Sequence, residues 1–462
     1  MQFRELEKAR VAILGMGREG QAVWRQIRSR YPGKPLSFFV ESELDAGFSK
    51  QLDAAIDDCH VGPLDVDALK EFDVLVRSSG ISPYRSELQQ LRSLGVLFTT
   101  ASNLWFAEHP DAKTICISGT MGKSTTAALI AHLLDQAGIK TCLAGNIGRP
   151  MLDCDDEGVK WWVIELSSYQ ISDLRARPDI AVLLNLSEEH LDWHQGVEAY
   201  RSDKLKLVHL VAEGRLIANY SDNVLIEHLQ DWPGVSWFNK PGKWQAGKDR
   251  VFHRSNKRHT QDLSRDRTPA MGPHQVSAPA SLPGAHNMQN LAAALTVLDE
   301  MSVSITDLGD ALASFAGLPH RLQFLGEKTG IRYINDSIST TPLSAAAALQ
   351  TIGHTDVVLL LGGMDRGLDW NSFAVGLLQQ EPHAIITLPD NGPKIIDCLK
   401  AAGVKPGGGL HLADRLSEAV ALARTLVPER GCILLSPGAP SFPHFRDFED
   451  RGNQFKKLAG FK

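Results

Sequence analysis

The sequence has few cysteines, and none stand at the spacing of a metal-binding motif. There are six in 462 residues, and no C-x-x-C pair occurs. They are Cys59, Cys116, Cys142, Cys154, Cys398 and Cys432. Scattered cysteines, several of them in apolar segments, are typical of buried reduced thiols rather than of a disulfide framework or a zinc site.

Long apolar runs are also lacking. No stretch approaches the ~20 apolar residues that a membrane-spanning helix needs. The first ten residues, MQFRELEKAR, lack the apolar core of a signal peptide. We therefore expect a cytoplasmic protein that does not insert into a membrane.

A concentrated positive charge is a third absence. The formal net charge is -6, and 22% of the residues are charged. Proteins that bind nucleic acids or anionic membranes in general need a strong positive field. This composition argues against both classes and favours small-molecule ligands.

What the sequence does contain is an alternation of short apolar strands with helical patterns along its whole length. Such alternation is typical of parallel sheets flanked by helices, so the predicted fold class is α/β. At roughly 100–200 residues per domain, the length predicts two to four domains. Three blocks are visible, and each has a turn rich in glycine or small polar residues after a strand. They start at RVAILGMGREG, KTICISGTMGKST and IRYINDS.

The second block carries the most informative motif, ISGTMGKSTT at residues 117–126. A glycine-rich turn between a strand and a helix, closing in Gly-Lys-Ser, holds phosphates with backbone amides, a lysine cation and a hydroxyl that binds magnesium. The usual first glycine position is Ile117, so the loop is a shortened form. The alternative is a tight turn without a ligand, but the helix N-terminus with its unpaired amides favours phosphate binding.

The first block carries a weaker motif. The segment Gly15-Met16-Gly17-Arg18-Glu19-Gly20 fits the dinucleotide pattern G-x-G-x-x-G, and Glu41 ends the next strand where a ribose-binding acid would stand. An NAD-dependent oxidoreductase must therefore be considered. A second nucleotide loop a hundred residues later is not expected of a simple dehydrogenase. A turn that holds another diphosphate, such as that of a UDP-sugar, is favoured.

Three further residues stand at or near predicted strand ends of the second block. They are Glu165 in WWVIELSSYQ, His190 in NLSEEHLDWH and Lys204 in YRSDKLKL. Taken singly, each has an ordinary explanation as a strand-end carboxylate, a core histidine or a surface lysine. Together with Ser124 they supply oxygen and nitrogen donors where parallel sheets place their ligands, which predicts a metal site.

The segment 247–284 is polar and poor in large apolar residues. We interpret it as a loop with an edge hairpin. Its basic cluster is interpreted as a solvated surface, and contact with an anionic ligand is the alternative.

Eight motifs follow one another along the chain. They are GTMGKST, ELSSYQ, NLSEEHLDWH, GAHNMQNLAAAL, LPHRLQ, YINDSISTTP, LLLGGMDRGLDW and LLSPGAPSF followed by FEDRGNQF. With these motifs in this order, the sequence resembles the Mur ligase family, and within it the ligases that add glutamate to UDP-N-acetylmuramoyl-L-alanine. The resemblance implies three domains: a UDP-substrate-binding domain over 1–103, an ATP-binding central domain over 104–317 and a Rossmann-like amino-acid-binding domain over 318–462. It also implies ATP as co-substrate, two Mg²⁺ ions and a monomeric bacterial enzyme.

The same resemblance implies roles for individual residues. Lys123, His190 and Lys204 are expected to be catalytic, and Lys204 is expected to be carbamylated, because a carbamate is a better magnesium ligand than a cation. The expected metal ligands are Ser124, Glu165, His190 and the Lys204 carbamate. The expected ATP-binding residues are Gly119, Thr120, Met121, Gly122, Lys123, Ser124, Thr125, Asn287, Asn290, Arg321 and Asp336. The UDP-substrate is expected to contact Gly15, Met16, Gly17, Arg18, Glu19, Gly20, Glu41, Ser42, Asn146 and Ser167.

The expected glutamate contacts are Ser339, Thr340, Arg366, Ser441 and Phe448. Here the sequence departs from the D-glutamate ligases, which carry an SKATN-like segment where this chain has Ser-Ile-Ser-Thr-Thr-Pro at 337–342. Those ligases also commonly have a lysine where this chain has Arg366, and arginine grips a carboxylate with a different geometry. The resemblance favours the branch that adds L-glutamate, with D-glutamate as the alternative. A non-catalytic ATP-binding regulator is a further alternative.

Overall fold

The computed structural model describes residues 1–44, 46–187, 189, 191–211, 215–253, 274–279 and 281–461. Within them the strands form three mainly parallel sheets and one small antiparallel sheet, which confirms the α/β fold class. The chain groups into two compact units: residues 1–277 with 285–312, and residues 278–284 with 313–462. Each unit is described by itself, and the three domain boundaries expected from the sequence stay a prediction.

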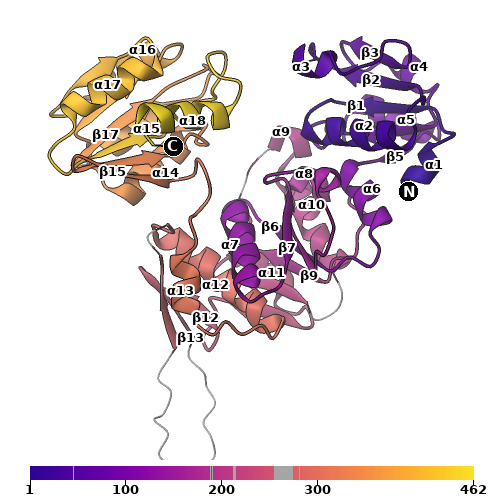
Figure 1. The fold of residues 1–462 in the computed structure, drawn as a ribbon, viewed down its shortest axis with the longest axis horizontal. Coiled ribbons are helices and arrows are strands. Elements are labelled where there is room, and N and C mark those ends of the chain that lie inside the picture. Colours follow the sequence, from indigo (N-terminus) through magenta and orange to yellow (C-terminus); the bar gives the residue numbers. More distant parts are fainter. Residues whose placement is uncertain are drawn as a thin grey trace, which may run out of the picture. The chain divides into compact units, whose positions relative to one another are not determined.

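The N-terminal sheet has five parallel strands in the order β3-β2-β1-β4-β5. Its strands are β1 (Val11–Leu14), β2 (Leu36–Val40), β3 (Asp57–Val61), β4 (Val74–Arg77) and β5 (Leu97–Thr99). Its helices are α1 (Phe3–Leu6), α2 (Arg18–Arg30), α3 (Ala46–Ser49), α4 (Val66–Leu69), α5 (Ser86–Ser93) and α6 (Ala101–Glu108). Helices cover both faces, because Val11 and Ile13 pack with α2 and α6, whereas Ala12 and Leu14 pack with α4 and α5 (Figure 1).

The central sheet has six parallel strands in the order β11-β10-β9-β6-β8-β7. Its strands are β6 (Thr114–Ser118), β7 (Thr141–Gly145), β8 (Trp161–Glu165), β9 (Ile180–Leu183), β10 (Leu216–Asn219) and β11 (Val235–Phe238). Its helices are α7 (Lys123–Gln136), the 3₁₀ helix η1 (Met151–Asp153), α8 (Ser168–Ile171), α9 (Leu191–His194), α10 (Val197–Leu210), α11 (Asn223–Leu229), α12 (Ala285–Glu300) and α13 (Leu308–Ala313). Strand β6 is buried along its whole length, as its β-branched and apolar residues predict for a central parallel strand.

A small antiparallel sheet follows, with the strands β12 (Trp244–Ala246), β13 (Arg250–His253) and β14 (His274–Ser277). The pairing of β13 with β14 confirms the hairpin expected within 247–284. Most of that segment's basic cluster falls in 254–273, which lies outside the described residues.

The C-terminal sheet has the order β15-β16-β20-β17-β18-β19, and only β15 among these strands runs antiparallel to its neighbour. Its strands are β15 (Gln323–Lys328), β16 (Ile331–Asn335), β17 (Val357–Leu361), β18 (Ala384–Thr387), β19 (Leu410–Leu412) and β20 (Cys432–Leu435). Its helices are α14 (Pro342–Ile352), α15 (Asn371–Leu377), α16 (Gly392–Ala402), α17 (Leu416–Leu426) and α18 (Phe448–Leu458). Apolar clusters on the two faces join β17 to α14–α16 and to α17–α18, respectively.

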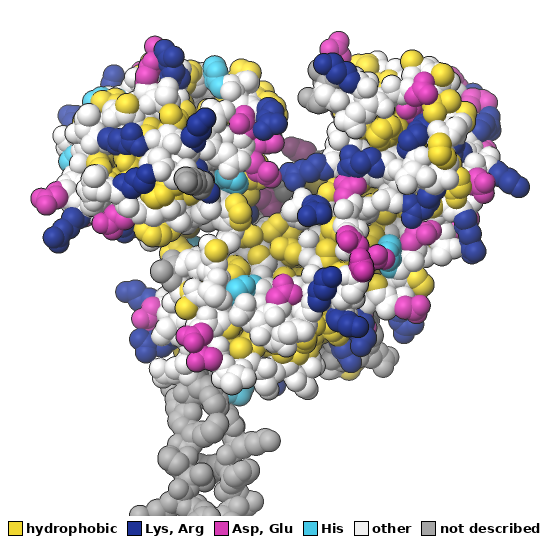
Figure 2. Space-filling view, in the orientation of Figure 1, with side chains coloured by type: hydrophobic (Ala, Val, Ile, Leu, Met, Phe, Trp, Pro, Cys, Tyr) yellow, Lys and Arg dark blue, Asp and Glu magenta, His cyan; other side chains and the backbone are white. Residues whose placement is uncertain are grey.

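The surface charges and the state of the cysteines agree with what the composition predicts. Figure 2 shows acidic and basic side chains mixed over the visible face of each unit. All six cysteines are free thiols, of which Cys116 and Cys432 are buried and the other four are partly exposed. Among the residues that the structure describes, no helix is both long enough and apolar enough to span a bilayer.

Candidate active site

The glycine-rich loop at 119–122 leads from β6 directly into α7, as the sequence predicts. Gly122 has a φ of +84°, a conformation that favours glycine. A Cβ atom at this position would lie 2.3 Å from Oδ1 of Asn290. Glycine is therefore required here both by the backbone and by the close approach of α12.

Asn185 holds the loop from the neighbouring strand end, and it was missed from the sequence. Its backbone and side-chain oxygens accept hydrogen bonds from the amide of Thr120 at 2.9 and 3.1 Å, and Oδ1 also accepts from the amide of Met121 at 2.8 Å. The hydroxyl of Tyr200 lies 2.7 Å from Oγ1 of Thr120. The available signal for Asn185 was a polar residue just after the apolar run of β9.

Asn287 and Asn290 belong to the first turns of α12, which packs against α7. Both are buried, and Nδ2 of Asn290 donates to Oδ1 of Asn287 at 2.9 Å. The structure thus brings together the phosphate loop and the HNMQN motif, which lie far apart in the sequence. This supports a shared nucleotide site.

Lys204 is buried at the same loop. Only 2% of this residue is exposed, and its Nζ donates to the carbonyl of Gly119 at 2.6 Å. Burial, together with the charge of Lys123, lowers the pKa of Lys204 to about 7, although Glu189 and Glu165 oppose the shift. Lys123 itself donates from Nζ to the carbonyl of Thr120 at 2.7 Å. The predicted residues Lys123, Glu165 and Lys204 therefore share one electrostatic environment.

Glu165 ends β8 and is 1% exposed. Its Oε1 accepts a hydrogen bond from Nδ2 of Asn146 at 2.7 Å, but its buried Oε2 has no hydrogen-bond partner within the described chain. A buried carboxylate oxygen without a donor is costly unless a cation satisfies it. Glu165 thus fits a magnesium ligand, and Asn146 orients it.

The other expected metal ligands are placed as follows. Ser124 stands in the first turn of α7 and is half-buried. His190 lies outside the described residues. The part of the chain that is described contains no group of three or more His, Cys, Asp or Glu side chains arranged to hold a metal ion.

The N-terminal turn also has the geometry of a diphosphate-binding loop. Gly17 caps α2, and a Cβ atom at Gly20 would lie 2.2 Å from the carbonyl oxygen of Gly15, so only glycine allows this close packing. Met16 is buried, whereas Arg18 is exposed and Glu19 accepts from Nε2 of Gln170 at 2.7 Å.

The other residues of the first unit that are expected to contact the UDP-substrate lie at three places. Glu41 and Ser42 are exposed after β2, and Glu41 forms an ion pair with Arg85. Ser167 caps α8, with Oγ accepting from the amide of Gln170 at 3.3 Å. Asn146 follows β7 and is tied to Glu165 as described above. The last two thus flank the candidate metal ligand.

In the second unit, Asp336 follows β16 and is buried. It accepts hydrogen bonds from the amide of Leu322 at 3.0 Å, from Oγ of Ser436 at 2.7 Å and from Oγ of Ser339. Burial raises the pKa of Asp336, and these hydrogen bonds and Arg321 oppose the shift. The expected nucleotide residues Arg321 and Asp336 are therefore neighbours in this unit.

The expected glutamate residues are spread over three loops of the second unit. Ser339 and Thr340 follow β16, Arg366 stands exposed in the loop after β17, and Ser441 is buried after β20. Phe448 begins α18, and its carbonyl accepts from Oγ of Ser337 at 2.8 Å. All three loops follow the carboxyl ends of parallel strands, where such sheets bind ligands.

Arg451 joins two of these loops and was missed from the sequence. It is fully buried, and it donates to Oγ and the carbonyl of Ser337 at 3.0 and 2.8 Å and to the carbonyl of Ala439 at 3.0 Å. Burial lowers its pKa to about 9. An arginine in a C-terminal helix rich in charged residues offered no signal of this role, because such a helix usually exposes its charges.

The chain thus has a glycine-rich loop between a strand and a helix of one parallel sheet and a second glycine-rich turn in another parallel sheet, a combination typical of nucleotide-binding α/β proteins. The model of the Mur ligase middle domain matches residues 117–298. A UDP-N-acetylmuramoyl-L-alanine–L-glutamate ligase of Xanthomonas campestris pv. campestris is 41% identical over all of this chain and 97% of its own length. A ligase of the same name from Micromonospora is 35% identical over 98% of this chain and 97% of its own.

The chain belongs to the Mur ligase family. Its fold is also similar to solved structures at low identity. The UDP-N-acetylmuramate–alanine ligase of Thermotoga maritima matches with a TM-score of 0.60 and 18% identity, covering 98% of this chain and 99% of that one. A MurF ligase of the same organism, in complex with ADP, matches with a TM-score of 0.59 and 15% identity, covering 99% and 96%.

Proposed function

We propose that this chain is an ATP-dependent ligase that joins L-glutamate to UDP-N-acetylmuramoyl-L-alanine and releases ADP and phosphate. The observation that carries the proposal is the buried amine of Lys204, which contacts the phosphate loop and shares its surroundings with Lys123 and Glu165. The substrates are those in the names of the full-length relatives. The segments SISTTP and DRGLDW support L- rather than D-glutamate.

The chemistry requires activation of a carboxylate. An amide does not form directly from a carboxylate and an amine at neutral pH, because oxide is too poor a leaving group. A carboxylate oxygen of the substrate's alanine attacks the γ-phosphorus of ATP, the bond from that phosphorus to the bridging oxygen breaks, and ADP leaves. The glutamate amine then attacks the acyl carbon, loses a proton and expels phosphate.

The residues of the first unit supply positioning and positive charge for this reaction. Lys123 and the backbone amides in the first turn of α7 would hold the β- and γ-phosphates of ATP. Asn287 and Asn290 would contact the nucleotide from α12, and Arg321 and Asp336 are further proposed nucleotide contacts. Asn146 and Ser167 would orient the muramoyl end of the substrate.

Magnesium would be held by Ser124, Glu165, His190 and a carbamate of Lys204. The unsatisfied buried Oε2 of Glu165 supports this assignment. When bound, two Mg²⁺ ions would neutralise phosphate charge. The carbamate forms when the neutral Nζ attacks carbon dioxide: an N–C bond forms, one C=O π bond becomes a carboxylate oxygen, and a proton is lost. A buried amine with a pKa of about 7 suits this step, because much of it is neutral near pH 7.

The UDP end of the substrate would bind at Gly15–Gly20 with Glu41 and Ser42. Glutamate would bind the second unit through Ser339, Thr340, Arg366, Ser441 and Phe448. The hydroxyl of Ser339 already donates to Asp336. It would therefore offer glutamate only its lone pairs, toward the amine. We further propose the three domains 1–103, 104–317 and 318–462, a monomeric state and a cytoplasmic location.

The test is incubation of the purified chain with ATP, Mg²⁺ and UDP-N-acetylmuramoyl-L-alanine plus either L- or D-glutamate, followed by the mass of the product. The proposal expects the dipeptide product with L-glutamate, and release of one phosphate per product. A product with D-glutamate only would assign the other branch. Absence of any product, with ATP bound normally, would reject the ligase and favour a regulator.

A further inference from the structure

The loop between β4 and α5, residues 78–84, packs directly on the first glycine-rich turn. A Cβ atom at Gly15 would lie 3.1 Å from Cβ of Ser78 and 3.3 Å from Cδ1 of Ile81. The amide of Ser79 also donates to Oε2 of Glu19 at 3.4 Å. Any displacement of the 78–84 loop therefore displaces the turn expected to hold the UDP end of the substrate.

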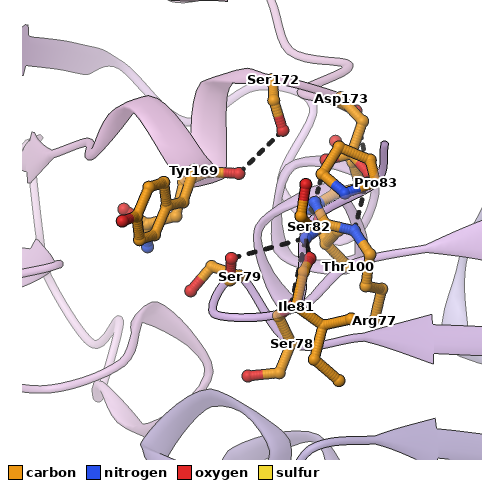
Figure 3. A network of polar contacts seen from close by, with 12 residues as sticks. Arg77, Ser78, Ser79, Ile81, Ser82, Pro83, Thr100, Tyr169, Ser172 and Asp173 are labelled. Carbon is orange, nitrogen blue, oxygen red and sulfur yellow. Dashed lines mark hydrogen bonds and ion pairs between the residues drawn. The ribbon is translucent and has the colours of Figure 1, made fainter. Parts of the chain in front are cut away.

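Arg77 fixes the shape of this loop and ties it to the central sheet (Figure 3). It is 1% exposed, and its Nη1 donates to the carbonyls of Ser78, Ser79 and Ile81. Its Nη2 and Nε donate to the two carboxylate oxygens of Asp173 at 2.9 and 3.2 Å. Asp173 follows α8, so one guanidinium group joins the loop to the connection between β8 and β9 of the central sheet.

Trp193 makes a second connection to the same loop. Its Nε1 donates to the carbonyl of Gly80 at 3.0 Å, and its own carbonyl accepts from Oγ of Ser82 at 2.6 Å. Its ring stacks on Tyr169 of α8, with centroids 4.2 Å apart. The loop is therefore held at its middle as well as at its start.

Tyr84 closes the loop with a third connection. Its hydroxyl donates to Oδ2 of Asp203 at 2.7 Å, and this carboxylate also contacts Nδ1 of His194 at 2.8 Å. Asp203 directly precedes Lys204 on α10, and Tyr169 stands four residues after Glu165. The central residues that hold the loop are thus close in the chain to the candidate ligands of the reacting centre.

We propose that Arg77 and Trp193 are positioning residues that set the distance between the UDP-binding turn and the reacting centre, so that one long substrate reaches both. The inference rests on the proposed function, because it assumes that the UDP end and the reacting carboxylate belong to one molecule. Binding energy from a remote part of a substrate is used to orient its reacting part. A misplacement of about 1 Å costs roughly a hundredfold in rate.

The experiment compares Trp193→Phe with the wild type. This variant keeps the ring on Tyr169 but loses the hydrogen bond to Gly80. Four quantities are measured: kcat, KM for UDP-N-acetylmuramoyl-L-alanine, KM for ATP, and the inhibition constant of UDP alone. We expect kcat/KM for the whole substrate to fall at least tenfold through kcat, while the inhibition constant of UDP and KM for ATP stay within about threefold.

Arg77→Lys is the second variant, because a lysine keeps the charge but cannot reach both Asp173 and the loop carbonyls. This variant should also lower kcat and leave the inhibition constant of UDP within about threefold of the wild type. Trp244→Phe is the matched control: it removes an indole hydrogen bond, to Asp299 at 2.8 Å, that does not involve the 78–84 loop. Its kinetic constants should match the wild type.

Two results would overturn the inference. One is an unchanged kcat/KM for the whole substrate in Trp193→Phe and Arg77→Lys. The other is a loss of UDP affinity equal to the loss of kcat/KM, which would make these residues part of the UDP site alone. The wild type is assayed first, so a failure of the proposed function would appear there as no ligation at all.

Discussion

Oδ1 of Asn290 occupies the space that a side chain at Gly122 would need, since a Cβ atom there would lie 2.3 Å away. We predict that Gly122→Ala weakens ATP binding at least tenfold, because the new methyl group displaces Asn290 and the φ of +84° is strained for alanine. Isothermal titration with ATP measures the change.

Gly138→Ala is the control for this substitution. Gly138 also has a positive φ, of +77°, but a Cβ atom there would meet nothing within 4 Å. It should lower the thermal midpoint slightly and leave ATP binding unchanged. Equal effects of the two substitutions on ATP affinity would show that the contact with Asn290 is unimportant.

Lys123→Ala is expected to abolish ligation and leave the fold intact. In the proposed ATP site this lysine would neutralise phosphate charge, and loss of such a group costs about 10²–10³-fold in kcat or more. Its hydrogen bond to Thr120 adds little to stability. Product formation and the thermal midpoint are measured beside Lys140→Ala, which removes an exposed lysine that donates to the carbonyl of Glu157. Near-normal turnover of Lys123→Ala would reject the ATP site.

Lys204 is expected to carry a carbamate in the active enzyme. Incubation with ¹³C-bicarbonate should give a carbamate carbon signal in the NMR spectrum of the wild type that is missing in Lys204→Ala. The alanine variant should lose at least about a hundredfold in kcat, and acetate should restore part of it by filling the vacated space. Lys204→Arg keeps a cation that cannot be carbamylated, and full activity of this variant would contradict the prediction.

Asp336 should make the stability of the second unit depend on pH. Burial raises its pKa in the folded chain. The favourable contribution of Asp336 to folding stability is therefore present below its pKa of about 3.9 in the unfolded chain. It is lost as the pH rises through the pKa in the folded chain. The thermal midpoint of Asp336→Asn relative to wild type should increase as the pH rises from about 4.

L-Glutamate should be preferred over D-glutamate by at least about a hundredfold in kcat/KM. The site must hold two carboxylates and present one amine, so inverting the α-carbon misplaces one of the three groups. Arg366→Lys should lose activity with L-glutamate, because a lysine cannot donate the two parallel hydrogen bonds with which a guanidinium group binds a carboxylate. Comparable or better use of D-glutamate by the wild type would overturn the choice of branch and leave the ligase assignment standing.

The sequence predicted the parts of the fold with strong local patterns. The apolar runs of β1, β6, β17 and β20 were recognised because both faces of these strands are buried. Strand β3, with the sequence DDCHV, was not recognised, because an edge strand with one exposed face carries polar residues. The three-residue strands β5 and β19 are too short to show any period.

The candidate site was predictable where a motif carries its own chemistry, as in Gly-Lys-Ser. Asn185 and Arg451 were missed because their roles depend on contacts with residues 65 and 114 positions away in the chain. A spacing pattern along the sequence does not indicate contacts over such distances in the chain. Lys204 was grouped with Ser124, Glu165 and His190 as a possible metal-site donor, but its carbamylation was expected only from the family resemblance, since a lone lysine in a helical pattern usually indicates a solvated face.

The packing of α12 on α7 also bears on how the protein is made. When the phosphate loop leaves the ribosome, the helix that completes it has yet to be synthesised. At roughly 5–20 residues per second, Asn290 follows Gly122 after about ten to thirty seconds. During that interval the apolar residues of α7 that α12 covers have no native partner. The nascent chain therefore acquires its nucleotide site late, and a transcript truncated before α12 should yield an aggregation-prone product that cannot bind ATP.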